Sequence, residues 1–250
     1  MDTTEYEFIK SRLNEPKDVE FLHKKMGLSK DMLYNILGRK IVRRVMRDFY
    51  KIKRKESLLL KRWIKGESFV KIAKSIRFPP VLTASFILQK KGFTKAGVQR
   101  FISNPNLIGE ARIRKEMKEA VKEDFIYSPW ATEIQGLNGK KAEEKILKWL
   151  QKRKVKFITE REAKFTYEKT PDFLLRDKPI KIKGHTANWI ESKASFGSPN
   201  EIKRNYKKQL KPYLDLFGSG VVVYWYGFVD DAQINKDVLI IDGTIFGRKK

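Results

Sequence analysis

The 250-residue sequence contains no cysteine and only two histidines, His23 and His185. The absence of cysteine excludes disulfide bonds, thiolate chemistry and zinc sites built from cysteine. Two histidines so far apart in the sequence also argue against a zinc site with several histidine ligands and against a histidine general base. Carboxylates must therefore carry any metal site in this chain.

Long hydrophobic runs are also missing. No stretch reaches the roughly 18 consecutive apolar residues that a membrane span needs, and residues 1–5 lack the basic and apolar regions of a signal peptide. We therefore expect a cytoplasmic protein with no membrane partner. Apolar residues make up 41% of the chain, which is enough to build a folded core.

Acidic residues are scarce relative to basic ones. Asp and Glu number 30 against 55 Lys and Arg, which gives a formal net charge of +25 at pH 7. A large positive charge makes a polyanion the natural partner. A nucleic acid bound mainly through its phosphate backbone is such a polyanion; we expect DNA, with RNA as the alternative.

The acidic residues that are present include three charged positions on two neighbouring apolar runs, Asp172 on the first and Glu191 and Lys193 on the second. If these runs form adjacent strands, Asp172 can converge with Glu191, and side chains two positions apart project from the same face. Two carboxylates and an ammonium group would then share a site suited to Mg²⁺ or Mn²⁺ and a phosphate. The alternative is an exposed cross-strand ion pair with no chemical role.

The flanking segments predict helices and a strand around this motif. Glu143 lies three, four and seven positions before apolar residues of a predicted helix, so its carboxylate lies on the face that should meet the core. Residues 200–217 predict a second helix, which carries Gln209. Residues 221–226 form a continuous apolar run, typical of a strand buried on both faces.

Three segments, Thr170–Phe173, Trp189–Gly197 and Val223–Phe228, together resemble the TPD-motif proteins. These proteins, which have archaeal and animal members, belong to the PD-(D/E)XK nucleases. The resemblance covers residues 137–228 and implies an α/β fold, a mixed sheet flanked by helices as in restriction endonucleases. Here an all-α region of helix-turn-helix character would precede that domain.

The resemblance also implies the roles of particular residues. Asp172, Glu191 and Lys193 would be the metal-binding and catalytic set, and Glu143 would complete the acidic cluster. Gln209 would assist, as in relatives similar to archaeal junction resolvases. The predicted metal ligands are then Asp172, Glu191, the Ser192 carbonyl and Glu143.

The first predicted domain, residues 1–55, is helical and contains a potential helix-turn-helix. Its last helix alternates apolar pairs with basic residues, and Arg43 and Arg47 lie on the basic face. A solvated charged face is the alternative for this helix taken alone. The excess of positive charge across the chain favours contact with phosphate.

The second predicted domain, residues 56–128, contains a clearer helix-turn-helix. Its second helix offers four polar side chains as nucleic-acid contacts, namely Thr83, Ser85, Gln89 and Lys90. Base-specific recognition usually needs bidentate contacts from Arg, Asn or Gln, so we expect recognition of shape or backbone. A purely structural helical hairpin is the alternative.

The third predicted domain, residues 129–250, is the nuclease domain. The sequence thus predicts a Mg²⁺- or Mn²⁺-dependent DNA endonuclease, acting on branched or structured DNA as expected of a repair enzyme. The alternatives are a non-catalytic DNA-binding protein with a nuclease-like scaffold, and an RNA nuclease. A homodimer and an unidentified protein partner are both compatible with the sequence.

Overall fold

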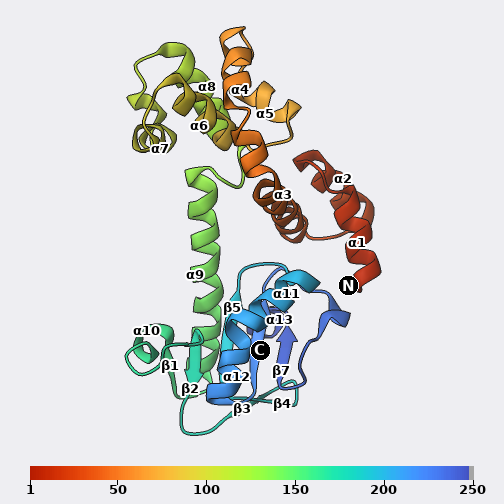
Figure 1. Ribbon diagram of the computed structural model, residues 1–250. Helices are drawn as coiled ribbons and strands as arrows, with labels where there is room; N and C mark the ends of the chain where they lie inside the picture. The colour runs from red at the N-terminus through yellow and green to blue at the C-terminus, as the bar shows by residue number, and fades with distance from the viewer. Residues whose placement is uncertain (248–250) are drawn as a thin grey trace. The chain divides into compact units, whose positions relative to one another are not determined.

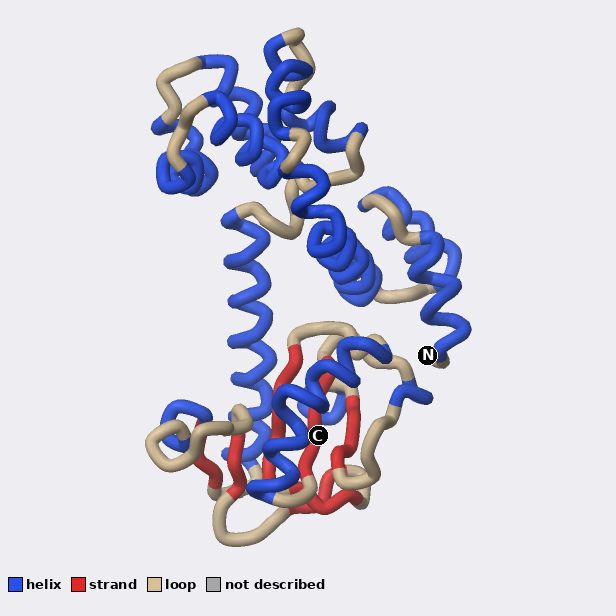
Figure 2. The backbone as a smooth tube through the Cα atoms, viewed as in Figure 1, coloured by secondary structure: helices blue, strands red, loops and turns tan. Residues whose placement is uncertain are grey.

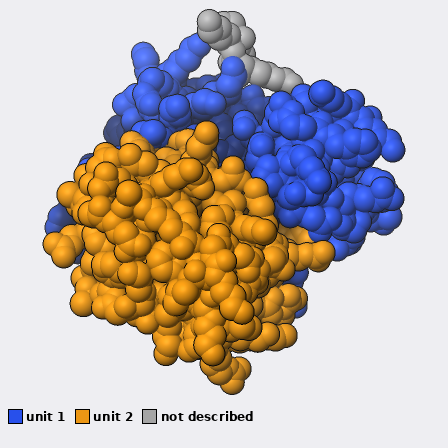
Figure 3. Space-filling model, turned by 90° about the horizontal axis from the view of Figure 1, so that it is seen from above, with its two compact units in different colours: residues 1–37, 137–250 blue, residues 38–136 orange. Residues whose placement is uncertain are grey.

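The computed structural model describes residues 1–247, and the chain forms two compact units. Unit 1 combines residues 1–37 with residues 137–250, and unit 2 comprises residues 38–136 (Figure 3). The boundaries between the units fall inside two long helices, α3 (Lys30–Lys53) and α9 (Pro129–Lys152) (Figure 1). No helix within residues 1–247 combines the length and apolar character that crossing a bilayer requires.

Unit 2 is all helical. Besides the ends of α3 and α9 it contains α4 (Glu56–Ile64), α5 (Phe69–Ser75), α6 (Pro80–Lys91), α7 (Lys95–Ser103), a 3₁₀ turn (Pro105–Leu107) and α8 (Ala111–Glu123). Ser68 and Thr94 cap α5 and α7 by accepting hydrogen bonds from backbone amides. Helix α6 packs against α4, α5, α7 and α8, and half of its side chains are therefore buried.

The first two helices, α1 (Thr3–Arg12) and α2 (Pro16–Met26), belong to unit 1 together with the start of α3. Tyr6 stacks on Phe196 with ring centroids 5.7 Å apart, and the Phe196 amide donates to Asn35 Oδ1 over 2.7 Å. The terminal ammonium group of Met1 lies 2.9 Å from Asp230. These contacts join residues 1–37 to the C-terminal part of the chain.

A mixed five-stranded sheet forms the centre of unit 1, in the order β1-β2-β5-β6-β7 (Figure 2). Its strands are β1 (Phe157–Thr159), β2 (Phe173–Leu175), β5 (Trp189–Lys193), β6 (Gly220–Tyr224) and β7 (Val238–Ile241). The pairs β1–β2 and β2–β5 are antiparallel, whereas β5–β6 and β6–β7 are parallel. Strands β3 (Ile180–Ile182) and β4 (His185–Ala187) form a separate hairpin.

Two apolar cores cover the faces of this sheet. On one face Ile146 and Leu150 of α9 pack with Phe173, Ile190 and Val221. The other face packs against α11 (Pro199–Asn205), the π-helical turn η2 (Tyr206–Leu210) and α12 (Lys211–Phe217). The remaining short elements are α10 (Glu160–Ala163), a 3₁₀ turn (Asp230–Ala232) and α13 (Thr244–Gly247). The predicted α/β class, with a helical N-terminal region before a mixed sheet, is confirmed.

Candidate active site

The sheet register brings Asp172 and Glu191 together. Phe173 pairs with Ile190 in the antiparallel ladder between β2 and β5. The residue before Phe173 therefore lies opposite the residue after Ile190, which is Glu191. Side chains alternate along a strand, so Glu191 and Lys193 lie on the face that η2 and α12 cover.

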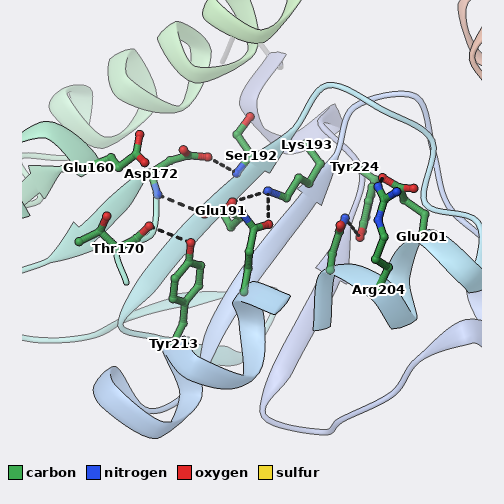
Figure 4. A network of polar contacts seen from close by, with 12 residues as sticks. Glu160, Thr170, Asp172, Glu191, Ser192, Lys193, Glu201, Arg204, Tyr213 and Tyr224 are labelled. Carbon is green, nitrogen blue, oxygen red and sulfur yellow. Dashed lines mark hydrogen bonds and ion pairs between the residues drawn. The ribbon is translucent and has the colours of Figure 1, made fainter. Parts of the chain in front are cut away.

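Backbone amides fix the two carboxylates (Figure 4). The Ser192 amide donates to Asp172 Oδ2 over 2.7 Å, and the Asp172 amide donates to Glu191 Oε2 over 3.2 Å. The Ser192 hydroxyl accepts a 2.9 Å hydrogen bond from the Trp225 indole. One oxygen of each carboxylate thus accepts a hydrogen bond from a backbone amide.

Lys193 lies between an acid and an amide side chain. Its Nζ donates to Glu191 Oε1 and, over 2.8 Å, to Gln209 Oε1. Gln209 reaches Lys193 from the π-helical turn η2, which precedes Pro212 in the first turn of α12. Proline has no amide hydrogen to close a regular helical turn, and π-helical turns often occur at functional sites.

Burial sets the electrostatics of this site. Glu191 is only 3% exposed, and burial raises its pKa although the Lys193 ammonium opposes that rise. Burial, and next the charge of Glu191, raise the pKa of Asp172 to about 8. Two desolvated carboxylates side by side resist double ionisation, so the pair favours a bound proton or a cation.

Glu143 and Glu144 face different surroundings, although they are adjacent on α9. Both side chains are exposed, so the prediction that the Glu143 carboxylate meets the core is wrong. Partial desolvation and the neighbouring Glu160 raise the pKa of Glu143, while Arg161 and Lys193 act to lower it. Glu144 pairs with Lys148 over 2.6 Å, which lowers its pKa. Glu143 is thus the acid of this helix that interacts electrostatically with the Asp172 and Lys193 side chains.

Two residues of the site had no role in the sequence prediction. The Glu160 amide donates to the Asp172 carbonyl over 3.1 Å, because Glu160 directly follows β1, which pairs with β2. The Tyr213 hydroxyl donates to the Thr170 carbonyl over 2.8 Å, two residues before Asp172. The sequence signals were weak: an acid after a short apolar run, and a tyrosine one helical turn beyond Gln209.

The donor set for a metal ion is small. Within residues 1–247, no three Asp, Glu, His or Cys side chains gather closely enough to form a metal cluster. Asp172 and Glu191 nevertheless offer adjoining carboxylates, whose pKa values are raised mainly by burial. A divalent cation would balance the charge of two ionised carboxylates, so the pair fits Mg²⁺ or Mn²⁺.

The predicted nucleic-acid contacts in α6 are not gathered on one open surface. Thr83 is fully buried and its hydroxyl donates to the Pro79 carbonyl. Gln89 donates to the Ser85 hydroxyl over 2.8 Å. Lys90 is exposed, and its Nζ lies 3.6 Å from Glu56. Helix α6 therefore presents few free polar groups.

The predicted basic face on α3, unlike the polar residues of α6, includes an exposed arginine. Arg43 is half-buried, and Arg47 is exposed and makes a bidentate contact with Asp48. Both residues lie within unit 2, whose 99 residues carry 24 Lys and Arg against 9 Asp and Glu. This unit holds a disproportionate share of the positive charge of the chain.

Comparison with known proteins finds relatives in vertebrates. The chain is 29% identical to CDAN1-interacting nuclease 1 of Xenopus laevis over 184 residues, which cover 70% of this chain and 60% of the relative. The Danio rerio protein of the same name is 30% identical over 149 residues, 58% of this chain and 49% of the relative. The Homo sapiens protein is 27% identical over 174 residues, which cover 66% of this chain and 62% of the relative.

The matches thus span less than two thirds of the length of these relatives. No solved structure matches the chain significantly. The family model described as "Protein of unknown function TPD sequence-motif" matches residues 109–244. This match covers more than half of the chain and includes Asp172, Glu191 and Lys193. The chain therefore belongs to the TPD sequence-motif family.

Proposed function

We propose that this protein is a metal-dependent nuclease of the PD-(D/E)XK type. The observation that carries the proposal is the convergence of Asp172, Glu191, Lys193 and Gln209 at the junction of β2 and β5. The relatives named as nucleases support the same activity. A mixed sheet between α9 and the η2–α12 segment also suits the restriction-endonuclease-like fold.

A divalent ion fits the carboxylate pair. Asp172 and Glu191 would hold Mg²⁺ or Mn²⁺ together with the Ser192 carbonyl, and Glu143 would add negative charge nearby. When bound, the ion would lower the pKa of water and neutralise charge that develops on the phosphate. It would also remove the mutual repulsion that raises the pKa of Asp172.

The protein residues would position the reactants. The Lys193 ammonium, held by Glu191 and Gln209, would orient the attacking water and offset charge on the phosphate oxygens. Gln209 leaves the ammonium its positive charge because it accepts a hydrogen bond without ionising. The Tyr213 hydroxyl, bound to the Thr170 carbonyl, would keep the segment before Asp172 in place.

DNA is the proposed substrate, and branched or structured DNA is the preferred form. The net charge of +25 suits a long polyanion rather than a small phosphoester. The branched preference rests on the resemblance to junction resolvases alone. RNA is the alternative polymer, since phosphate contacts do not distinguish the two.

One observation favours a rival function, a nucleic-acid-binding protein that does not cleave. In the described part of the chain no cluster of three acidic or histidine side chains is formed. A binding protein, however, gains nothing from buried carboxylates that repel phosphate. The paired acids therefore favour the enzyme.

The test is a cleavage assay with linear, nicked, flap and four-way DNA and with single-stranded RNA. Each substrate is incubated with Mg²⁺, Mn²⁺ or EDTA. We expect cleavage of DNA with either ion, fastest on branched forms, and none in EDTA. Binding to every substrate without cleavage under any condition would support the rival function. Faster cleavage of RNA than of DNA would identify RNA as the substrate.

A further inference from the structure

Unit 2 contains a cluster of three arginines that is not part of the acidic site. Arg44 and Arg47 lie on α3, and Arg77 lies in the turn between α5 and α6 (Figure 1). Arg44 interacts electrostatically with both of the other guanidinium groups. Three positive charges repel one another, so their proximity calls for a compensating anion.

Arg44 is the least satisfied member of this cluster. The residue is half-buried, and its Nε is shielded from solvent and has no hydrogen-bond partner among residues 1–247. Burial, and next the charges of Arg77 and Arg47, lower the pKa of Arg44. A shielded guanidinium N–H without an acceptor is rare in folded proteins, and such a group is suited to accept a ligand that supplies the missing acceptor.

Aromatic packing holds the two segments of the cluster together. Phe49 of α3 meets Phe86 of α6 with ring centroids 5.3 Å apart, and Phe86 stacks on Phe78 at 5.9 Å. Phe78 directly follows Arg77, whose φ of 52° is left-handed and unfavourable for a non-glycine residue. The fold thus maintains a strained backbone at Arg77 close to the poorly satisfied guanidinium group of Arg44.

An exposed tyrosine lies beside Arg47 on α3. Tyr50 is 74% exposed and comes three positions after Arg47, so the two side chains are neighbours on the helix surface. Asp48 is the acid in contact with Arg47, so one of the three charges is already balanced. Arginines next to an exposed tyrosine suit a phosphate with a neighbouring unstacked base.

We propose that Arg44, Arg47 and Arg77 bind a backbone phosphate of single-stranded or unpaired nucleic acid, and that Tyr50 stacks on an adjacent base. This binding site rests on the proposed nuclease function in one respect, namely that nucleic acid is the partner. The excess of 15 basic residues in unit 2 favours that partner over a small anion.

The test measures the binding of a fluorescent 20-nucleotide oligothymidylate to the full chain in EDTA, by anisotropy at several salt concentrations. Arg44→Met and Arg77→Gly should each weaken binding about five-fold at 0.1 M salt. Because the arginines share one phosphate, each variant should reduce the log–log salt slope by at most about 0.7, the value for one whole phosphate contact on a single strand. Arg44→Lys should also weaken binding, because lysine keeps the charge but lacks the guanidinium fork. Arg100→Ala, which removes an exposed charge on α7, is the matched control.

Thermal unfolding separates a lost ligand site from a damaged fold. Arg44→Met removes an unpaired charge and Arg77→Gly relieves a left-handed residue, so neither should lower the melting temperature.

Tyr50→Ala should weaken oligothymidylate binding about ten-fold with little effect on the binding of duplex DNA, and Tyr50→Phe should restore oligothymidylate binding.

Parent-like affinity in both arginine variants, or equal losses in Arg100→Ala, would overturn the phosphate contact. Equal effects of Tyr50→Ala on single strands and duplex would overturn base stacking. Tight binding of polyglutamate at the same salt would indicate an acidic protein as the partner instead. Because binding is measured in EDTA, where no cleavage is expected, this test of the arginines does not depend on whether the protein is a nuclease.

Discussion

Replacing Asp172 with asparagine should stabilise the metal-free protein at high pH. The ordinary pKa of 3.8 rises to about 8 in the folded protein, mainly through burial and next through Glu191. Because the folded pKa is the higher one, ionisation opposes folding as pH rises. The free energy of unfolding of the parent is therefore highest below about pH 4, where Asp172 is protonated in both states. It falls as the pH rises from about 4 to about 8.

The magnitude follows from the pKa difference. At 1.36 kcal/mol per pKa unit the ceiling is about 6 kcal/mol above pH 8. Asp172 is partly exposed and shares its charge with Glu191, so we expect about 2 kcal/mol, or roughly 4–8 °C in melting temperature for a chain of this size. The Ser192 amide can still donate to the asparagine carbonyl, so the variant keeps that hydrogen bond.

The assay is thermal unfolding in EDTA between pH 4 and pH 9. The melting temperature of Asp172→Asn should exceed that of the parent by an amount that grows with pH and levels off above pH 8. Glu144→Gln is the control, because its exposed carboxylate is paired with Lys148 and has a lowered pKa. Curves for Asp172→Asn and the parent that stay parallel across this range would refute the reasoning.

Three further variants test other parts of the account. Glu143→Gln should raise the Mg²⁺ concentration needed for half-maximal cleavage, whereas Glu144→Gln should match the parent; a metal titration of the cleavage rate that gives the reverse order would mean that the other acid serves the site. Gln209→Leu removes an acceptor from the site's lysine and should slow cleavage about 10- to 100-fold with unchanged DNA affinity, so an unaffected single-turnover rate would remove it from the mechanism. Gly220→Ala should destabilise the protein by about 1–3 kcal/mol in denaturant unfolding, because a Cβ would lie 2.1 Å from the Trp189 ring; an unchanged midpoint would show that the ring can move.

The geometry of the acidic site followed from local sequence pattern. Alternation along a strand puts Glu191 and Lys193 on one face whatever the rest of the fold does. The 100° step of a helix separates Glu143 from Glu144, but it did not predict that both side chains stay exposed. Glu160 was missed because its position depends on the pairing of β1 with β2, which joins residues distant in sequence.

The helical region was harder to predict for the same reason. The pattern of α6 resembles a recognition helix, yet its neighbours α4, α5, α7 and α8 bury it, including Thr83. Residues 1–37 join unit 1 through Tyr6 and Asn35, which contact Phe196. Local periodicity shows that a helix face is apolar but does not show which distant element covers it.

Single-turnover cleavage of DNA by Glu191→Gln tests the central claim most directly. The substitution keeps the shape of a buried side chain but removes the charge that would hold both the metal ion and Lys193. With saturating Mg²⁺ we expect the parent to cleave, and the variant to bind DNA at least as tightly while its cleavage rate falls by a factor of a hundred or more, about 3 kcal/mol of lost transition-state stabilisation. Cleavage by Glu191→Gln at the parental rate would contradict the assignment of this site.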